Sequence, residues 1–475
     1  MKKIITILSI FILFSSCEKL EDLNENTKDP ANVSGESLFT GAQKNLLDQM
    51  VNTNVNFNVF RLFAQYWTET TYTDESNYDL FTRTIPDNHW SVLYRDVLKD
   101  FDESGKIITT TVYPVTESPL VKQNKLAIVE VMTVYTYSIL VETFGNVPYN
   151  EALNVDILLP EYDDGLTVYK DLLDRLNVAI AQLDPSEGSF GLADNLYQGD
   201  VAAWIKFANS LKLRMGMLLS DVDETAAEAA IVAAAPHVFT SNSDNAALVY
   251  SGASPNTNPL YADLVASGRH DFVPTSRIID VMNDLEDPRR PFYFTLYEGA
   301  YVGGEYGMEN DFTTYSHIAD RIQEPIFEGT ILDYSEVEFL LAEAVERGFA
   351  VGGTAEGHYN NAIEASITYW GGTEAEVSDY LANTQVAYST AEGNFKEKIG
   401  TQKWLALYNR GFEAWTEWRR LDYPILVAPP DALSVVPLRY TYPIAEQTLN
   451  GANYNSASDA IGGDDVATRL FWDVF

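Results

Sequence analysis

Cysteine is almost absent from this chain of 475 residues, which contains a single one, Cys17. One thiol cannot form an intramolecular disulfide, so a disulfide-stapled secreted scaffold is excluded and stability must come from burial of apolar surface. The residues for such a core are present, because 46% of the chain is hydrophobic and 12% is aromatic. The same composition excludes disordered and collagen-like proteins.

Basic residues are scarce as well. The chain has 31 lysines and arginines against 69 aspartates and glutamates, which gives a formal net charge of −38 at pH 7. Nucleic-acid binding needs basic side chains that displace the counterions of phosphate groups. We therefore exclude nucleic acid as a partner, and we expect repulsion from an anionic membrane surface unless the chain is tethered to it.

Motifs for catalysis and for metal binding are also missing. The sequence has no G-x-S-x-G, H-E-x-x-H, G-x-x-x-x-G-K-[ST] or G-x-G-x-x-G pattern, and its five histidines are scattered without metal-ligand spacing. Two carboxylates could serve glycoside hydrolysis, but 69 acidic residues create close pairs by composition alone. The sequence predicts a protein that is not an enzyme, with no catalytic residue, no metal site and no cofactor.

The N-terminus has the pattern of an export signal. Lys2 and Lys3 precede the apolar stretch 4–14, which is too short to span a bilayer, and two serines then lead directly to Cys17. Small residues before a lone cysteine are typical of bacterial lipoproteins, in which the thiol is acylated, with palmitate among the chains. We predict three parts: a signal peptide over 1–16, a lipidated N-terminus with a polar stalk over 17–35, and a single α-helical domain over 36–475.

Helical periodicity recurs along the body of the chain. Residues 126–144 are apolar on nearly all sides, which predicts a fully buried helix, and Glu130 and Glu142 argue against a transmembrane span. Two further helices, over 335–348 and 356–370, are spaced like a tetratricopeptide pair. Amphipathic stripes are found over 169–183, 204–219, 337–345 and 404–415.

Strand signals are few and short, and the best are residues 247–250 and 292–296. Long segments without clear periodicity, which are usually functional when they are loops, cover 245–274, 296–324 and 428–475. The fold predicted is mainly α, with tetratricopeptide-like helix pairs, long irregular loops and a few short strands.

Aromatic residues in loops are the candidates for a binding site. One group lies among glycines between residues 296 and 317, and the other lies in a stretch rich in Thr, Asp, Glu and Asn near residue 70. Aromatic faces beside polar groups suit sugar rings, although packing of these rings into the core is the alternative for each residue. The candidate ligand-contact residues are Trp67, Tyr72, Tyr78, Tyr297, Tyr301, Tyr306 and Tyr315.

Several motifs resemble one family. The run L-V-E-T-F-G-N-V-P-Y over 140–149 is similar to the E-x-[YF]-G-[DN]-V-P-Y signature of SusD/RagB-type outer-membrane lipoproteins, and similar motifs follow in the family's order to the last residues. The closest resemblance is to the subgroup without a defined substrate. The other matching segments are 199–215, 334–348, 359–371, 400–404, 413–420, 442–446 and 468–473.

This resemblance implies four tetratricopeptide-like helix pairs carrying an irregular region that faces the ligand. It also implies a lipid-anchored protein at the outer surface of the outer membrane, acting as the lid of a SusC-like TonB-dependent transporter. Such a protein binds a nutrient, most often an oligosaccharide, and delivers it to the transporter. The matching motifs are helix-packing residues, so the resemblance to this family identifies no ligand-contact residue in the chain.

Three alternatives remain open from the sequence. The same role with peptide ligands is the nearest, and neighbouring peptidase or glycosidase genes would discriminate the two. A lipid-anchored glycoside hydrolase would need two carboxylates about 5–10 Å apart in a cleft. A structural or adhesive surface protein is favoured if the loop aromatics are buried.

Overall fold

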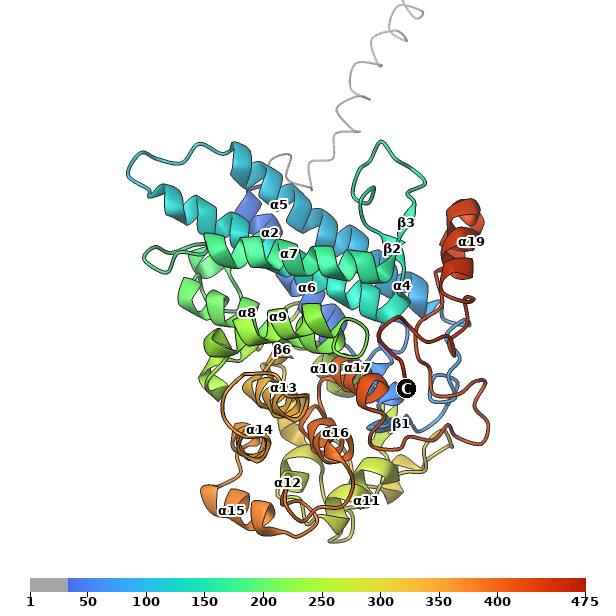
Figure 1. Ribbon diagram of the computed structural model, residues 1–475. Helices are drawn as coiled ribbons and strands as arrows, with labels where there is room; N and C mark the ends of the chain where they lie inside the picture. Colours follow the sequence, from blue (N-terminus) through green and yellow to red (C-terminus); the bar gives the residue numbers. More distant parts are fainter. Residues whose placement is uncertain (1–32) are drawn as a thin grey trace, which may run out of the picture.

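The computed structural model describes residues 33–475, so the predicted signal peptide and Cys17 lie outside the described residues. Helices dominate the molecule (Figure 1), which confirms the predicted fold class. The longer α-helices are α2 Gly35–Val51, α5 Lys99–Thr110, α6 Pro119–Phe144, α7 Gly165–Gln182, α8 Val201–Leu218, α9 Glu224–Ala234, α13 Tyr334–Glu346, α14 Ala355–Trp370, α16 Phe395–Ala406, α17 Gly411–Leu421 and α19 Gly451–Ala460. Shorter ones are α3 Phe60–Phe63, α4 Ile85–Ser91, α10 Pro259–Tyr261, α11 Ser276–Asp284, α12 Arg290–Tyr293, α15 Glu374–Ala382 and α18 Ile444–Leu449.

Helices that follow one another in sequence pack side by side. α5, α6, α7, α8 and α9 form a continuous stack, and α13 with α14 and α16 with α17 extend it toward the other end of the molecule (Figure 1). The pair predicted over 335–348 and 356–370 is present as α13 and α14. The irregular segments gather beside this stack of helix pairs.

Local chemistry fixes where these helices begin. Asp164 precedes α7 and accepts a hydrogen bond from the backbone N–H of Thr167 at 2.9 Å. Asp200 caps α8 in the same way, through the N–H groups of Ala202 and Ala203. An aspartate at this position satisfies amides that have no partner inside the helix and faces the positive end of its dipole, so the predicted stripes start at these caps.

α6 is the central helix of the stack, as its all-round apolar sequence predicts. It packs against α5 and α7 and also contacts α8. Among the described residues it is the one helix long and apolar enough to cross a membrane, but 89% of its most apolar window is buried inside the protein. Glu142 near its end is buried and accepts a hydrogen bond from the Tyr169 hydroxyl at 2.8 Å. We conclude that α6 is a core helix.

The strands form three short antiparallel pairs. β1 (Trp67–Glu69) pairs with β5 (Phe272–Pro274), so that Glu69 lies opposite Phe272. The other two pairs join β2 (Val147–Pro148) with β3 (Tyr162–Asp163), and β4 (Ala246–Leu248) with β6 (Gly329–Leu332).

The strand predicted at 247–250 is found as β4, but the prediction of a strand at 292–296 is wrong. Residues 290–293 form α12, with a proline in its first turn, and only Phe294 makes an isolated bridge, to Ile318. Proline is favoured at the start of a helix because its φ angle is already helical.

Two other expectations need correction. The stripe over 404–415 is divided between α16 and α17 by a turn at 407–410. The segments expected to be long loops also contain helices and strands: α10 and β5 in the first, and α18 and α19 in the last.

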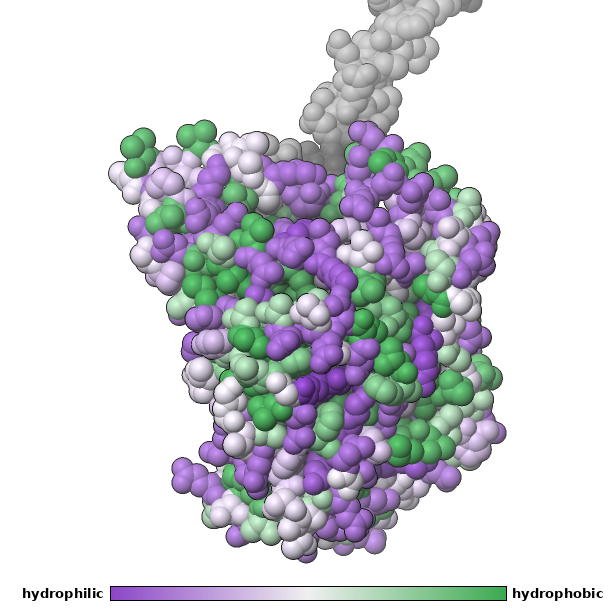
Figure 2. Space-filling view, in the orientation of Figure 1, coloured by the Kyte–Doolittle hydropathy of each residue, from purple (hydrophilic) through white to green (hydrophobic). Residues whose placement is uncertain are grey.

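One large cluster of buried apolar residues runs from Phe39 to Trp472, and a smaller one surrounds α14 and α15. The face drawn in Figure 2 mixes hydrophilic and hydrophobic residues, with apolar side chains at the tip of the α5–α6 connection at its upper left, where Val112 and Val115 are exposed.

Candidate functional site

Three of the predicted contact residues are core residues. Trp67, Tyr78 and Tyr306 are buried. The Trp67 indole N–H donates to the Tyr408 hydroxyl at 2.8 Å, and the Tyr306 hydroxyl donates to the Leu62 carbonyl at 2.7 Å. A ring held this way cannot stack on a ligand from solution, so the core-packing alternative describes these three residues.

The other candidates reach the surface at different places. Tyr297 and Tyr315 are half-buried, and Tyr301 is half-buried with the Arg290 guanidinium 5.5 Å from its ring centre. Tyr72 is 70% exposed. Of the seven predicted residues, only Tyr72 lines the polar pocket described next, so the structure does not bring the candidates together in one site.

A pocket of about 130 Å³ lies at the end of the β1–β5 pair. The strand pairing brings together segments that are 200 residues apart, because Thr70 donates from its hydroxyl to the His270 carbonyl and from its N–H to the Asp271 carbonyl. The loop after α2 supplies a third side. The lining residues are Thr53, Asn54, Val55, Asn56, Glu69, Thr71, Tyr72, Arg83, Asp263, Ser267, Arg269, Asp271 and Phe272.

Tyr72 occupies an unusual backbone conformation. Its φ angle is 56°, in the left-handed region that residues other than glycine seldom adopt. Such a conformation costs on the order of 1–3 kcal/mol and persists where surrounding structure enforces it, often at binding sites. The backbone that carries the exposed ring is therefore held at the rim of the pocket.

Two buried carboxyl groups lie behind this rim. Glu69 accepts a hydrogen bond from the Ser76 N–H at 2.9 Å, while Glu75 is fully buried and pairs with Arg83. Burial, together with a hydrogen bond to the neighbouring Glu75 carboxyl, raises the pKa of Glu69 far above its ordinary value. At neutral pH Glu69 is therefore protonated.

Further polar groups converge from the β5 side. Arg269 pairs with Asp271, with 2.6 Å between Nε and Oδ2, and burial raises the pKa of Asp263. Next to this segment the ring of Phe312 is stacked between His270 and His317, with centroid distances of 4.3 and 3.8 Å. Planar amides, carboxyls and guanidinium groups beside an exposed ring can bind hydroxyl groups and the C–H face of a sugar.

Most of this pocket could not be predicted from the sequence. Its residues come from three distant segments, and only the strand pairing shows that Asp263 and Asp271 lie near Tyr72. One local signal existed: asparagines alternate with other residues over 52–58, and Asn54 and Asn56 of that run line the pocket.

No group of three or more His, Cys, Asp or Glu suited to a metal ion occurs within residues 33–475.

Comparison with known proteins gives a consistent result. The model of a family described as "SusD-like_2: Starch-binding associating with outer membrane" matches residues 27–443. A solved structure described as a chitin-binding protein is 27% identical, with a TM-score of 0.79, over 93% of this chain and 100% of that one. A SusD homologue from Bacteroides uniformis is 27% identical, with a TM-score of 0.76, over 92% of this chain and 99% of that one.

A further structure shares the fold at lower identity. It is a chitin-binding SusD homologue from Flavobacterium johnsoniae, 22% identical with a TM-score of 0.79, and the match covers 92% of this chain and 98% of that one. No curated protein sequence matches the chain.

Proposed function

Since the chain belongs to the SusD-like family described as starch-binding and associating with the outer membrane, we propose that it captures an oligosaccharide at the Tyr72 pocket and delivers it to a SusC-like TonB-dependent transporter. Chito-oligosaccharides are the first ligands to test, because a relative with 27% identity is described as chitin-binding. Malto-oligosaccharides come second, because the family description refers to starch.

The single observation that carries this proposal is the position of Tyr72. This side chain is 70% exposed, its backbone is left-handed, and it adjoins a pocket lined by amide, carboxyl and guanidinium groups. One such stacking contact contributes about 0.5–1.5 kcal/mol. A few contacts of this size with some hydrogen bonds support roughly millimolar to micromolar affinity, which suits a receptor that must release its ligand.

The protein is a binding protein and not an enzyme, as its family's description indicates.

The proposed location is the outer surface of the outer membrane, with lipid on Cys17. The sequence around Cys17 supports this part of the proposal. An anchor of two or more acyl chains holds a protein on a bilayer despite a net charge of −38.

The experiment is affinity electrophoresis and calorimetric titration of residues 18–475 with chitohexaose and maltohexaose. Tyr72→Ala should lower affinity about 2- to 10-fold, from loss of one stacking contact, without changing the melting temperature. Phe81→Ala is the matched control, because Phe81 is an aromatic residue that is 53% exposed and does not line the pocket. Equal affinity of the wild type and Tyr72→Ala would remove the pocket from the proposal, and release of shorter sugars by the pure protein would contradict a receptor.

A further inference from the structure

The α5–α6 connection, residues 111–118, projects from one edge of the molecule with aliphatic side chains at its tip. Val112 is 94% exposed and Val115 is fully exposed. Residues 104–116 contain no acidic side chain, although the chain has 69 of them. The two valines therefore project from a stretch without negative charge, and exposed aliphatic groups gathered at one place are typical of a contact surface.

Polar groups at the base of this tip are hydrogen-bonded within it. The Thr109 hydroxyl donates to the Gly105 carbonyl at 2.7 Å. The Thr111 hydroxyl donates to the Ile107 carbonyl at 2.8 Å. The Lys122 ammonium donates to the carbonyls of Thr109 and Thr111, at 2.7 and 3.1 Å. Groups bonded in this way lose little when water is removed, because an apolar medium penalises the polar groups that lack a partner.

The N-terminal segment of the chain enters the fold beside this tip. Gly35, the first residue of α2, accepts a hydrogen bond on its carbonyl from the Ser104 hydroxyl of α5 at 2.7 Å. Tyr113 in the connection donates from its hydroxyl to the Glu36 carboxylate at 3.0 Å. Gly35 is 18 residues after Cys17, a length of chain that spans at most about 65 Å. A lipid on Cys17 would keep the start of α2, and the tip beside it, within that distance of a bilayer.

A second apolar loop lies at the other end of α5. Lys99, the first residue of α5, donates to the Leu153 carbonyl at 3.2 Å, which holds the β2–β3 connection, residues 149–161, at that end. In this connection Val155 is 75% exposed and Leu158 is 86% exposed. α5 has 12 residues and is about 18 Å long at about 1.5 Å per residue. Both connections lie along the upper edge of Figure 1, so a flat surface can touch both loops at once.

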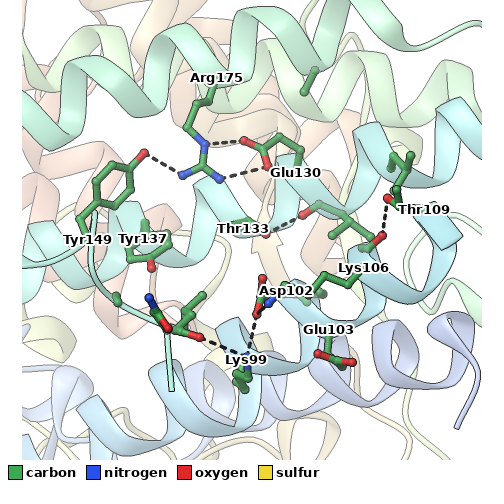
Figure 3. Close-up of a pocket in the computed structure, with 18 of the residues that line it drawn as sticks. Lys99, Asp102, Glu103, Lys106, Thr109, Glu130, Thr133, Tyr137, Tyr149 and Arg175 are labelled. Carbon is green, nitrogen blue, oxygen red and sulfur yellow. Dashed lines mark hydrogen bonds and ion pairs between the residues drawn. The ribbon is translucent and has the colours of Figure 1, made fainter. Parts of the chain in front are cut away.

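A groove of about 1310 Å³ separates the two loops, with α6 as its floor between α5 and α7. Figure 3 shows this groove, with Lys99 and Thr109 toward opposite ends of α5. Glu103 and Asp174 line the groove with exposed carboxylates that have no ionic partner among the described residues. Charged groups of this kind keep their water, so contact of this edge with an apolar medium is confined to the two loops.

We propose that the two loops at the ends of α5 enter the headgroup region of a lipid bilayer, so that α5 lies along the membrane surface. This inference rests on the proposed function in one respect, the lipid on Cys17. A few aliphatic side chains bind a bilayer only weakly, but an anchor makes the contact intramolecular, at an effective concentration in the millimolar range. The β2–β3 connection contains Asp156 and the chain has a net charge of −38, so the matching bilayer is one without net charge.

The test uses residues 17–475 coupled through the Cys17 thiol to a maleimide lipid in phosphatidylcholine vesicles, with and without brominated acyl chains. Cys17 is the only cysteine, so the coupling is specific and does not depend on natural acylation. Val115→Trp and Leu158→Trp are the reporters, because bromine quenches tryptophans that enter the lipid. Each added tryptophan should lose about half or more of its emission, since a tethered contact is occupied for most of the time. Val249→Trp is the matched control, because Val249 is 69% exposed and lies outside both loops.

A charge placed in the tip should reverse the effect. Val112→Asp in the Val115→Trp protein should restore most of the quenched emission, because a carboxylate resists leaving water, whereas Val249→Asp in the same protein should not. The proposal stands if both reporters are quenched, Val249→Trp is not, and Val112→Asp restores emission. It is overturned if either reporter keeps its emission, if Val249→Trp is quenched equally, or if Val112→Asp has no effect.

The outcomes separate this contact from the anchor and from other occupants of the loops. An unmodified natural Cys17 would overturn the inference together with the anchor. Unquenched reporters beside an acylated natural Cys17 would overturn the inference alone. A blue shift of the Val115→Trp emission that grows with protein concentration, without vesicles, would assign the tip to a second copy of the chain and would also overturn it.

Discussion

Glu69 and Glu75 are neighbours behind the exposed ring of Tyr72, and burial of Glu69 beside the Glu75 carboxyl raises the pKa of Glu69. Glu75 has no exposed surface, and its second oxygen meets no N–H or hydroxyl donor of the described residues. A protonated Glu69 carboxyl is a donor for that oxygen, whereas an ionised Glu69 would place a second negative charge beside it.

This pair predicts a pH dependence of stability. The pKa of Glu69 is raised in the folded state from its ordinary value of 4.5, so the folded state binds a proton that the unfolded state loses above about that pH. The stabilisation is complete below pH 4.5 and decreases as the pH rises, by up to about 1.4 kcal/mol per pH unit, until folded Glu69 ionises. We expect Glu69→Gln, whose amide donates permanently to Glu75, to remove this slope.

The measurement is the melting temperature between pH 5 and pH 9 for the wild type and for Glu69→Gln. Glu305→Gln is the control, because Glu305 is exposed and the substitution removes the same charge. If the Glu69→Gln curve runs parallel to the wild-type curve over the whole range, the pKa of Glu69 is not raised in the folded protein.

Tyr306 should behave as a core residue. Tyr306→Ala removes a buried ring and should destabilise the protein by about 3–5 kcal/mol. Tyr306→Phe should cost about 0.5–1.5 kcal/mol, because the Leu62 carbonyl loses the Tyr306 hydroxyl but keeps the Gln65 N–H as a donor. Urea unfolding gives both values, with Tyr72→Ala as the exposed comparison, expected within about 0.5 kcal/mol of the wild type. A stable Tyr306→Ala protein that has lost sugar binding would reverse this assignment.

Breaking the ion pair between Asp287 and Arg289 should lower the free energy of unfolding far more than breaking an exposed pair. Both side chains are fully buried, and Arg289 also donates to Ser366 and Gln402. Arg289→Met leaves the Asp287 carboxylate buried without its partner, which should cost about 3–5 kcal/mol.

Arg95→Met is the matched control for that prediction, because Arg95 pairs with Asp96 while its side chain is 72% exposed. It should change the free energy of unfolding by about 0–1 kcal/mol. Equal effects of the two substitutions in urea unfolding would show that burial does not decide the value of these pairs.

Cys17→Ser tests the proposed anchor. Without the thiol no acyl chain can be attached, so we expect a soluble protein or an uncleaved precursor in place of a membrane-bound form. Detergent phase partitioning and mass determination of the N-terminus distinguish these states, with Tyr72→Ala as a variant that should stay in the membrane fraction. A processed Cys17→Ser protein that stays in the membrane fraction would contradict the anchor.

The helix pairs could be predicted because each helix carries its own signals. In α7 and α8 an aspartate cap precedes a regular apolar stripe. The break between α16 and α17 carries no such signal, since the apolar period continues across it. A methyl group on Gly411 would lie 2.6 Å from the backbone nitrogen of Arg61, so the turn there is fixed by close contact with α3, which the sequence of this segment cannot show.

The glycines around Tyr306 explain why the candidate site was only partly predicted. Glycines spaced among tyrosines are typical of a mobile, exposed loop, but a Cβ on Gly303 would lie 2.3 Å from the Ser276 nitrogen, and one on Gly307 would lie 2.4 Å from Pro429. These glycines permit close backbone packing, which draws Tyr306 into the core. Tyr72 has no such neighbours and remains at the surface.

The burial of α6 also determines how the protein will fail under stress. If α7 separates from α6, apolar side chains along α6, a helix long enough to span a membrane, become exposed to water. Exposed apolar surfaces of this size promote aggregation. Aggregation on heating should therefore begin with opening of the α6–α7 interface, before the irregular segments beside the helices unfold. Buffer and storage conditions are therefore best chosen by how well they stabilise the α6–α7 interface.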